Sequence, residues 1–326
     1  MKIAYIVLAH KYPEQLNRLI IKLDNEETSF FIHIDKKTSN KVYNQIVSSL
    51  SHLPNVYFLN RYKCYWGGFG LVKATIQGIK EIFDRNIYFD WLILLSGQDY
   101  PLKTNSQIKK ALEKNEGKLF LTHYDYLIPP DKKWPTSGSD RIDYWHFCLS
   151  NYVRFVFPAK LTANSYLRYK ILKRPWLQFL SFLYSCLFFW LPLKKRKFPE
   201  GFKPFIGSQF WCLSRDCVEY IHVFVQQNPD FINFFKYVDI PDEMFFQTVV
   251  LNSPFKERVV NDNLFCIDWD NINQTYPKVF VKTDFDRLIS SSKLFARKFD
   301  MIRDVDILNL LDQKLLSDAV SRGNVK

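Results

Sequence analysis

The apolar positions of this 326-residue chain alternate between short continuous runs and longer amphipathic stretches. Continuous runs of strand length are typical of strands buried on both faces of a sheet, and apolar residues at helical spacing indicate amphipathic helices. Their alternation up to about residue 125 predicts βαβ units and a Rossmann-like, mainly parallel α/β sheet flanked by helices. The predicted strands are Ile3–Ala9, Phe30–Ile34, Val56–Leu59, Trp91–Leu95 and Leu119–Thr122, and the predicted helices are Glu14–Leu23, Lys41–Leu50, Leu71–Phe83 and Ser106–Lys114.

The second half of the chain is less regular. Residues 124–170 are rich in aromatic, basic and turn-forming residues, which indicates irregular structure there, within a basic-aromatic insertion over 124–205. No linker clearly separates two domains, so we expect one domain over 1–302 and a helical tail over 303–326. After the insertion we predict a strand over Phe210–Ser214, helices over Cys217–Gln227 and Asp242–Leu251, and short strands before the tail.

The chain carries a net charge of +12, so we expect an anionic partner such as a nucleotide diphosphate or an anionic membrane. The chain lacks a basic helix and the aromatics of RNA-binding motifs, so we predict no nucleic-acid partner. Six cysteines are scattered without a CxxC pair, which indicates reduced thiols in a cytosolic protein. The N-terminal apolar run is too short for a signal peptide, and we expect the protein to lie on the cytoplasmic side.

The apolar segment Trp176–Leu193 is just long enough to span a bilayer, and basic residues flank both of its ends. A single span would place the N-terminal half and the C-terminal motifs on opposite sides of the membrane. We therefore favour an in-plane or re-entrant contact with an anionic membrane through residues 173–197. A buried core or acceptor-groove helix and a true span are the alternatives.

Polar and aromatic side chains follow two of the predicted strands. Asp35 ends the strand Phe30–Ile34, and ligands of open α/β sheets bind at the carboxyl ends of the strands. Asp35 is therefore a candidate for hydrogen bonding to the ribose or base of a nucleotide, and a helix N-cap or turn is the structural alternative. Tyr65 and Trp66 precede two glycines, which suits either a stacking platform for a base or sugar or a tight, aromatic-filled turn.

Glu243 is the candidate general base. It follows Pro241 and Asp242 at the start of the predicted helix over Asp242–Leu251. Acidic residues in a first helical turn complement the helix dipole, so structure alone explains them. The phenylalanines that follow Glu243 would also desolvate it in part, and a partly desolvated carboxylate is a good proton acceptor.

Two adjacent cations, Arg297 and Lys298, lie between aromatic residues near the end of the domain. Cations anchored in this way can hold a diphosphate without a metal, and a solvated basic turn is the alternative. Lys278 is a candidate third cation. Gln209 and Phe210 either line a sugar pocket or begin a strand.

Eight segments, taken in order, resemble the core-2/I-branching β-1,6-N-acetylglucosaminyltransferase and peptide O-xylosyltransferase family. The resemblance runs from residue 3 to about residue 302. The matching segments are AYIVLAHKYP (4–13), FFIHIDKKT (30–38), YWGGFGLVKA (65–74), LLSGQDYPLKT (94–104), IGSQFWCLSR (206–215), PDEMFFQTVVLNSPF (241–255), DNLFCIDW (262–269) and LFARKFD (294–300).

The resemblance implies a GT-A-like fold, a UDP-sugar donor, inversion at the anomeric carbon, and no metal or other cofactor. It divides the domain into a nucleotide-binding half (1–123), an acceptor- or membrane-facing insertion (124–205) and a catalytic half (206–302). By position, it assigns the general base to Glu243 and the cations on the diphosphate to Arg297 and Lys298, with a further basic position at Lys278. It assigns contacts with the nucleotide to Leu8, Asp35, Tyr65 and Trp66, and contacts with the donor sugar to Gln209 and Phe210. Gln98 and Asp99 are expected to form the floor of the donor site.

The acidic residues give no pattern typical of a metal site. An Asp-x-Asp motif directly after a central strand would be needed, and Asp99 stands alone at that place. The pairs Asp268–Asp270 and Asp304–Asp306 lie late in the chain and outside such a context. We therefore predict no metal site.

The expected activity is metal-independent, inverting transfer of a sugar from a UDP-sugar to a glycan or lipid-linked glycan acceptor. N-acetylglucosamine is the favoured sugar, with xylose or galactose as alternatives, and surface polysaccharide synthesis is the expected setting. A non-catalytic membrane- or glycan-binding protein is the alternative from another class. The long segments and disulfide framework of the Golgi members are absent, and the acceptor region matches the family poorly, so the resemblance does not identify the acceptor. From the cysteine usage and the basic, apolar segment over 173–197 we expect a cytoplasmic protein, peripheral on the inner face of the cell membrane.

Overall fold

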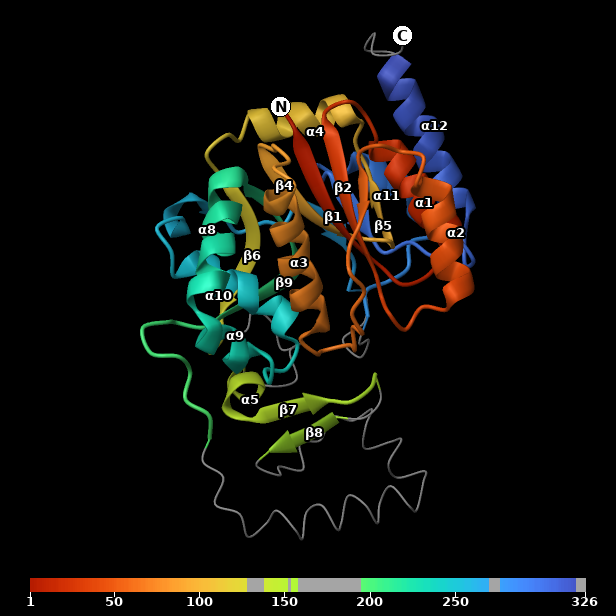
Figure 1. The fold of residues 1–326 in the computed structure, drawn as a ribbon. Coiled ribbons are helices and arrows are strands. Elements are labelled where there is room, and N and C mark those ends of the chain that lie inside the picture. The colour runs from red at the N-terminus through yellow and green to blue at the C-terminus, as the bar shows by residue number, and fades with distance from the viewer. Residues whose placement is uncertain (128–137, 152–153, 158–194, 270–275, 321–326) are drawn as a thin grey trace.

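The computed structural model describes residues 1–127, 138–151, 154–157, 195–269 and 276–320 (Figure 1). Their main sheet has seven strands in the order β10-β6-β9-β4-β1-β2-β3. Neighbouring strands are parallel except at β9, which runs antiparallel to both β4 and β6. The predicted mainly parallel α/β fold is therefore confirmed. The strands are β1 (Ile3–Ala9), β2 (Thr28–Ile34), β3 (Val56–Phe58), β4 (Trp91–Ser96), β6 (Leu119–Asp125), β9 (Phe205–Ser214) and β10 (Val259–Val260).

Helices pack on the sheet through regularly spaced apolar residues. In α1, Leu16, Leu19, Ile20 and Leu23 are buried at helical spacing, and a proline begins the helix. Figure 1 shows α3 and α8 lying together in front of the sheet, where α3 packs on β1 and β2 and α8 packs on β4 and β9. The helices are α1 (Pro13–Leu23), α2 (Asn40–Leu50), α3 (Gly70–Asp84), α4 (Asn105–Glu113), α5 (Gly138–Asp143), α8 (Arg215–Gln227), α9 (Pro229–Phe235), α10 (Phe245–Leu251), α11 (Phe285–Ser290) and α12 (Asp306–Val320), with 3-10 turns η1 (Pro241–Glu243), η2 (Lys256–Arg258) and η3 (Lys282–Asp284).

Two smaller sheets lie beside the main one. The first has the order β11-β12-β5, so that the segment directly after β4 pairs with a strand from the end of the domain. The second is a hairpin of β7 and β8, which follows α5 inside the predicted insertion. The expectation of irregular structure there is thus wrong for these elements. Their strands are β5 (Asp99–Pro101), β7 (Trp145–Cys148), β8 (Arg154–Phe157), β11 (Phe265–Ile267) and β12 (Phe295–Arg297).

The predicted helix over Asp242–Leu251 is interrupted. Residues Pro241–Glu243 form the 3-10 turn η1, and the helix α10 begins only at Phe245. Met244 breaks the helix because its φ of −132° is not helical. Ile240, which enters the turn, has a left-handed φ of 49°. Glu243 therefore lies on a tight turn ahead of the helix and not within it.

The C-terminal helix α12 packs against the rest of the domain. Its Leu308 and Leu311 are buried, and Asp312 accepts hydrogen bonds from Tyr100 Oη at 2.7 Å and Arg18 Nε at 2.8 Å. The proposed division of the chain into halves, insertion and tail remains a prediction.

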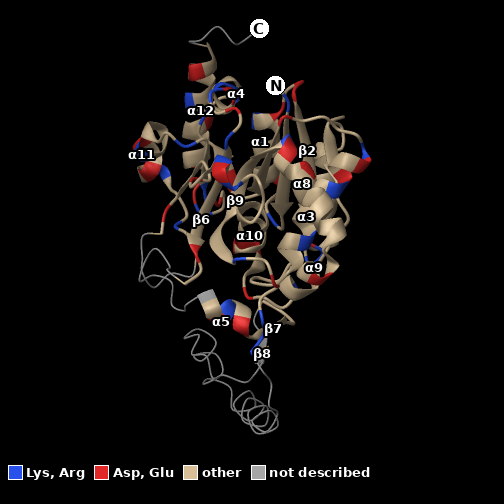
Figure 2. Cartoon of the chain, turned by 90° about the vertical axis from the view of Figure 1, so that its left-hand side faces the viewer, with Lys and Arg blue, Asp and Glu red and all other residues tan. Residues whose placement is uncertain are grey.

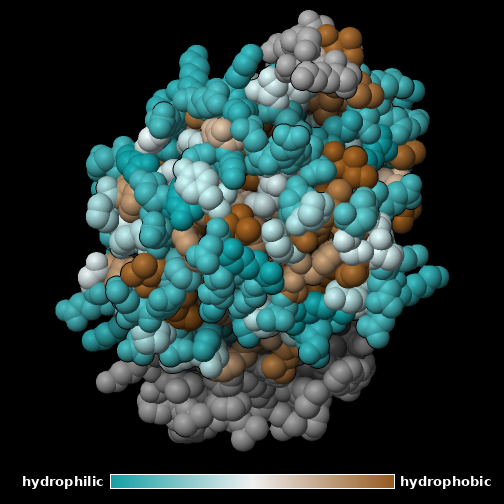
Figure 3. Space-filling view, turned by 45° about the horizontal axis from the view of Figure 1, so that its top comes forward, coloured by the Kyte–Doolittle hydropathy of each residue, from teal (hydrophilic) through white to brown (hydrophobic). Residues whose placement is uncertain are grey.

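The surface of the described part is mixed in character. Basic and acidic residues are interspersed along the elements in Figure 2, and the face shown in Figure 3 is mainly hydrophilic with small, separate apolar groups. Among the described residues, no helix has both the length and the apolar character needed to cross a bilayer. The predicted membrane segment Trp176–Leu193 lies outside the described residues. Arg196, expected near headgroups, is buried and donates to the carbonyls of Phe234 and Tyr237, so it is not available to lipid.

Replacing Gly207 with alanine should destabilise the fold, because a Cβ there would lie 1.8 Å from the carbonyl oxygen of Thr122 on the neighbouring strand. We expect urea unfolding to show a loss of about 1–3 kcal/mol or more, as for other overpacked sites. Gly97→Ala is the matched control, since its Cβ would meet nothing closer than 3.5 Å. Equal stability of the two variants would contradict this account of β9.

Candidate active site

The carboxyl ends of β1, β2 and β4 meet at one edge of the main sheet. The backbone N–H of Asp35 donates to the carbonyl of Ala9 at 2.9 Å, and that of Gly97 donates to the carbonyl of Leu8 at 3.0 Å. Leu8, Asp35 and the turn after β4 therefore lie side by side, as predicted for strand ends. The Leu8 side chain is buried, so only its backbone borders this edge.

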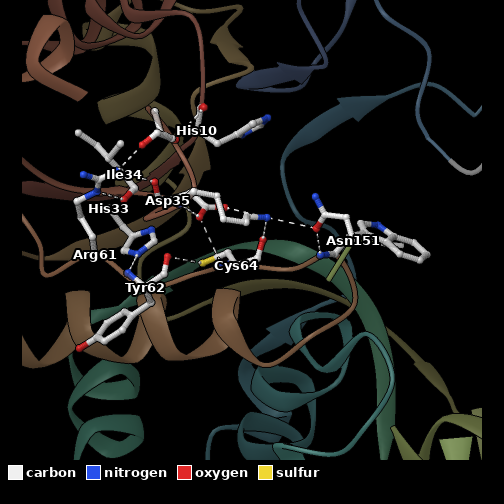
Figure 4. Close-up of polar contacts among 11 residues, drawn as sticks. His10, His33, Ile34, Asp35, Arg61, Tyr62, Cys64 and Asn151 are labelled. Atoms are coloured by element: carbon white, nitrogen blue, oxygen red, sulfur yellow. Dashed lines mark hydrogen bonds and ion pairs between the residues drawn. The ribbon is translucent and has the colours of Figure 1, made fainter. Parts of the chain in front are cut away.

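Asp35 anchors the loop that follows β3 (Figure 4). Its Oδ1 accepts from the backbone N–H groups of Lys37 at 2.9 Å and Cys64 at 3.4 Å, and the Lys37 ammonium lies 3.3 Å from Oδ2. The same ammonium donates to the Cys64 carbonyl and to Asn151, and Asn151 accepts from the backbone of Trp66 at 3.1 Å. Asp35 therefore stabilises a turn, which is the structural alternative predicted for it. A direct contact of Asp35 with a nucleotide remains a prediction.

Trp66 belongs to an exposed cluster of aromatic rings and cations. Its ring meets that of Tyr276 edge-on, with centroids 6.4 Å apart. The Arg154 guanidinium, from β8, lies 5.5 Å from the Trp66 ring, and the Lys298 ammonium lies 5.0 Å from the Tyr276 ring. Such a cluster suits stacking with a base or sugar. Tyr65 is separate from it and lines a cleft formed with β7.

Arg297 is held between a buried carboxylate and an aromatic ring. It stands opposite Asp99 in the pairing of β12 with β5, and its Nη1 lies 3.5 Å from Asp99 Oδ1. Asp99 is fully buried and accepts from the backbone and hydroxyl of Ser96 at 2.7 and 2.8 Å. Burial raises the pKa of Asp99, and the charge of Arg297 opposes that rise. The guanidinium lies 3.9 Å from the Phe210 ring, so the structure brings these two predicted site residues together.

Lys298 lies in a group of like charges. Its side chain is half-buried, and burial is the main cause that lowers its pKa, with the nearby charges of Arg297 and Lys11 adding to the effect. Asp300 offsets part of this, but it also accepts from Tyr12 at 2.7 Å. Because three cations repel one another here, an anion placed among them would be bound favourably.

Lys278 and Gln209, which were also predicted to bind the sugar donor, have different surroundings from each other. The Lys278 ammonium is paired with Asp284 at 2.9 Å, while its carbonyl accepts from the backbone of Lys298 at 3.3 Å. Lys278 therefore lies beside the cation group, but its charge is already paired. Gln209 is half-buried, and its side-chain amide has no hydrogen-bond partner among the described residues. This amide is therefore available to a ligand.

Two acids with different surroundings stand next to each other in η1. Glu243 is 26% exposed, and its Oε2 accepts from Arg141 Nη1 at 2.9 Å. Asp242 is buried, and its Oδ1 has no hydrogen-bond partner within the described part of the chain. Burial, and then the neighbouring charge of Glu243, raise the pKa of Asp242 to about 7, while Arg141 and Arg297 oppose the rise. The charge of Arg297 therefore acts on the pKa of Asp242 in η1, so the acids of η1 and Arg297 belong to one site.

Arg141 and Tyr276 were not predicted as site residues. Arg141 lies in the insertion, where no sequence pattern singles it out, and Tyr276 follows a stretch of sequence without a motif. Both reach the site only through the tertiary fold. A signal for Tyr276 existed in its position just before Pro277 and the candidate Lys278.

The described residues contain no group of three or more His, Cys, Asp or Glu side chains that could hold a metal. Of the acidic pairs considered above, Asp268 is ion-paired with Arg287, and Asp304 accepts from the backbone of Lys282. Asp270 lies outside the described residues.

Residues 3–289 match the Core-2/I-Branching enzyme family. Since this match spans most of the chain, the protein belongs to the Core-2/I-Branching enzyme family, whose members are glycosyltransferases. The predicted resemblance is confirmed, and the described residues form the mainly parallel α/β sheet flanked by helices that was expected.

Similar proteins include two xylosyltransferases of Rattus norvegicus. Xylosyltransferase 2 is 28% identical over 333 residues and Xylosyltransferase 1 is 26% identical over 337 residues, covering 96% and 97% of this chain. The matches cover 33% and 35% of those proteins, so the chain spans about a third of their length. A similar solved structure, the mannosyltransferase Ktr4p from S. cerevisiae, is 9% identical with a TM-score of 0.30, over 75% of this chain and 65% of that one. A likeness at that TM-score supports no conclusion about this chain.

Asp242→Asn should stabilise the protein by an amount that grows with pH. The folded protein retains the Asp242 proton up to a pKa of about 7, whereas an unfolded aspartate loses it near 3.8. The folded state therefore binds more protons between these values, so this residue costs stability as the pH rises from about 4 to 7. Asparagine resembles the protonated acid and does not titrate. Urea unfolding of both proteins at pH 4.5, 6 and 8 measures the difference, and a difference that stays constant with pH would contradict the burial argument.

Proposed function

We propose that the protein is an inverting, metal-independent glycosyltransferase that moves a sugar from a UDP-sugar to a glycan hydroxyl. The observation that carries the proposal is an accessible carboxylate, Glu243, next to Asp242, on which the charge of Arg297 acts, while Lys298 follows Arg297 in the chain. Membership of the Core-2/I-Branching enzyme family supports the same conclusion.

In the proposed reaction, Glu243 removes the proton from the acceptor hydroxyl as its oxygen attacks C1 of the donor sugar. The attack comes from the face opposite UDP, so the configuration at C1 inverts. Arg297 and Lys298 stabilise the negative charge that grows on the departing diphosphate. A positioned base typically contributes about 10²–10⁴-fold in rate, and fixed cations add an electrostatic contribution of similar kind.

Between the two acids of η1, Glu243 is the better choice of base. Its carboxylate is partly exposed, whereas Asp242 Oδ1 is buried and therefore out of reach of a substrate. A general base must come within hydrogen-bond distance of the proton that it removes. Asp242 instead contributes to the electrostatic environment of its neighbour.

For the donor we propose UDP-N-acetylglucosamine. UDP-xylose is the second candidate, because the similar proteins of Rattus norvegicus are named xylosyltransferases. For the acceptor we propose a glycan or lipid-linked glycan used in surface polysaccharide synthesis, met at the inner face of the cell membrane. The net charge of +12 suits both an anionic donor and an anionic membrane surface.

Glu243→Gln should abolish turnover while leaving UDP binding intact, because glutamine keeps the shape of the side chain but cannot accept the proton. UDP release from UDP-N-acetylglucosamine and UDP-xylose measures turnover, and calorimetric titration measures UDP affinity. We expect a loss of at least about 10²-fold in kcat. Glu257→Gln, at an exposed position of η2, is the matched control. Near-normal turnover in Glu243→Gln would overturn the assignment.

A further inference from the structure

The Glu243 carboxylate is held from one side by an arginine of the insertion. Arg141 Nη1 donates to Oε2 at 2.9 Å, and the arginine side chain is only 9% exposed. A buried guanidinium at this distance restrains both the position and the rotation of the carboxylate. The bond occupies one carboxylate oxygen and leaves Oε1 to face other groups.

The short helix that carries Arg141 is fastened to the chain segment that carries Glu243. The Arg141 carbonyl accepts from the backbone of Asp239 at 3.1 Å, and the backbone of His146 donates to the Tyr237 carbonyl at 2.9 Å. Arg196 adds a third link, since it donates to the carbonyls of both Tyr144 and Tyr237. Arg141 is therefore fixed relative to η1 before any substrate binds.

The charges around η1 give the arginine a specific task. Asp242 and Glu243 are adjacent acids, and the charge of Glu243 disfavours the ionised form of Asp242. Arg141 and Arg297 are the positive charges that act on Asp242 from other elements, and Arg297 is already held by Asp99. Arg141, by contrast, bonds directly to the carboxylate of Glu243.

We propose that Arg141 is a positioning residue that orients the Glu243 carboxylate so that Oε1 takes the proton from the acceptor. This inference rests on the proposed function, because it assigns to Arg141 a role that acts through the base. An ion pair that only fastens the insertion to the domain is the competing explanation. The two differ in what they predict for kcat and for UDP affinity.

The test uses Arg141→Gln in the full chain, with UDP release from the UDP-sugar that the wild type hydrolyses. Glutamine keeps a donor but loses the charge and the forked geometry. We expect kcat to fall by about 10–100-fold, the loss associated with a misplaced catalytic group, while the Kd for UDP stays within about twofold of wild type. In the Glu243→Gln background, the same change should have no further effect, because Arg141 acts only through Glu243.

Two further variants separate positioning from fastening. Arg141→Lys keeps the charge without the fork, and we expect it to recover part of the lost kcat. Lys195→Gln removes the exposed ion pair between Lys195 and Asp143, which fastens the same helix but does not touch Glu243, and we expect it to match the wild type. If Arg141→Gln fails to fold, Arg141→Lys becomes the variant that separates positioning from fastening. The expected result is then a reduced kcat with an unchanged Kd for UDP.

Three results would overturn the inference. The first is a kcat for Arg141→Gln that lies within about twofold of wild type. When only Arg141→Lys folds, the same criterion applies to the kcat of that variant. The second is a loss of kcat matched by an equal loss of UDP affinity, and the third is a loss of the same size in Lys195→Gln. A wild-type protein that neither binds UDP nor hydrolyses a UDP-sugar would instead defeat the proposed function itself.

Discussion

The candidate site depends on one buried ion pair, between Asp99 and Arg297. The two residues are far apart in the sequence, yet they stand opposite each other in the antiparallel pairing of β5 with β12. Reciprocal bonds extend the pairing: Phe299 donates its backbone N–H to the Gln98 carbonyl at 2.9 Å, and Gln98 Nε2 donates to the Phe299 carbonyl at 3.1 Å. A buried ion pair contributes little net stability, but removing one partner leaves a buried charge uncompensated. The pair therefore acts mainly to fix the place of Arg297 at the end of β4.

This constraint brings cations together and places Arg297 where its charge acts on Asp242. Arg297 and Lys298 are adjacent in the chain, so fixing the first brings the second close to Lys11. The repulsion among them is a cost that an anionic ligand removes, and a nucleotide diphosphate has the charge to do so. The turn η1 presents Glu243 and buries Asp242. In the proposed reaction, the cations stabilise the leaving diphosphate while Glu243 receives a proton.

Local sequence patterns predicted the elements well where burial follows a simple period. The strand β1 and the helices α1 to α4 lie within a residue or two of their predicted ranges, because their apolar residues repeat regularly. Long-range pairing carries no such local signal, so neither the antiparallel direction of β9 nor the strand β5 was predicted. The break at Met244 was missed for a similar reason, since nothing in the run of apolar residues marks the change from a turn to a helix.

The same distinction explains which site residues could be found. The ends of buried strands and aromatic-flanked cations are visible in sequence, and this is how Asp35 and Arg297 became candidates, whereas Phe210 was assigned to the donor sugar by the family resemblance. Their partners were not visible, because Arg141 and Tyr276 reach the site from segments without a recognisable pattern. The hydrogen bond between Asp35 and the backbone of Cys64 is likewise visible only in the three-dimensional arrangement.

The central claim is that fixed cations hold the donor diphosphate in the place of a metal. Calorimetric titration of UDP, with and without EDTA, tests it most directly in the wild type and in Lys298→Gln. The account predicts the same Kd with and without EDTA. It also predicts a Kd about 10–100-fold weaker in Lys298→Gln, as expected for the loss of a charge-assisted contact. UDP binding that requires a divalent metal, or that is unaffected by Lys298→Gln, would contradict it.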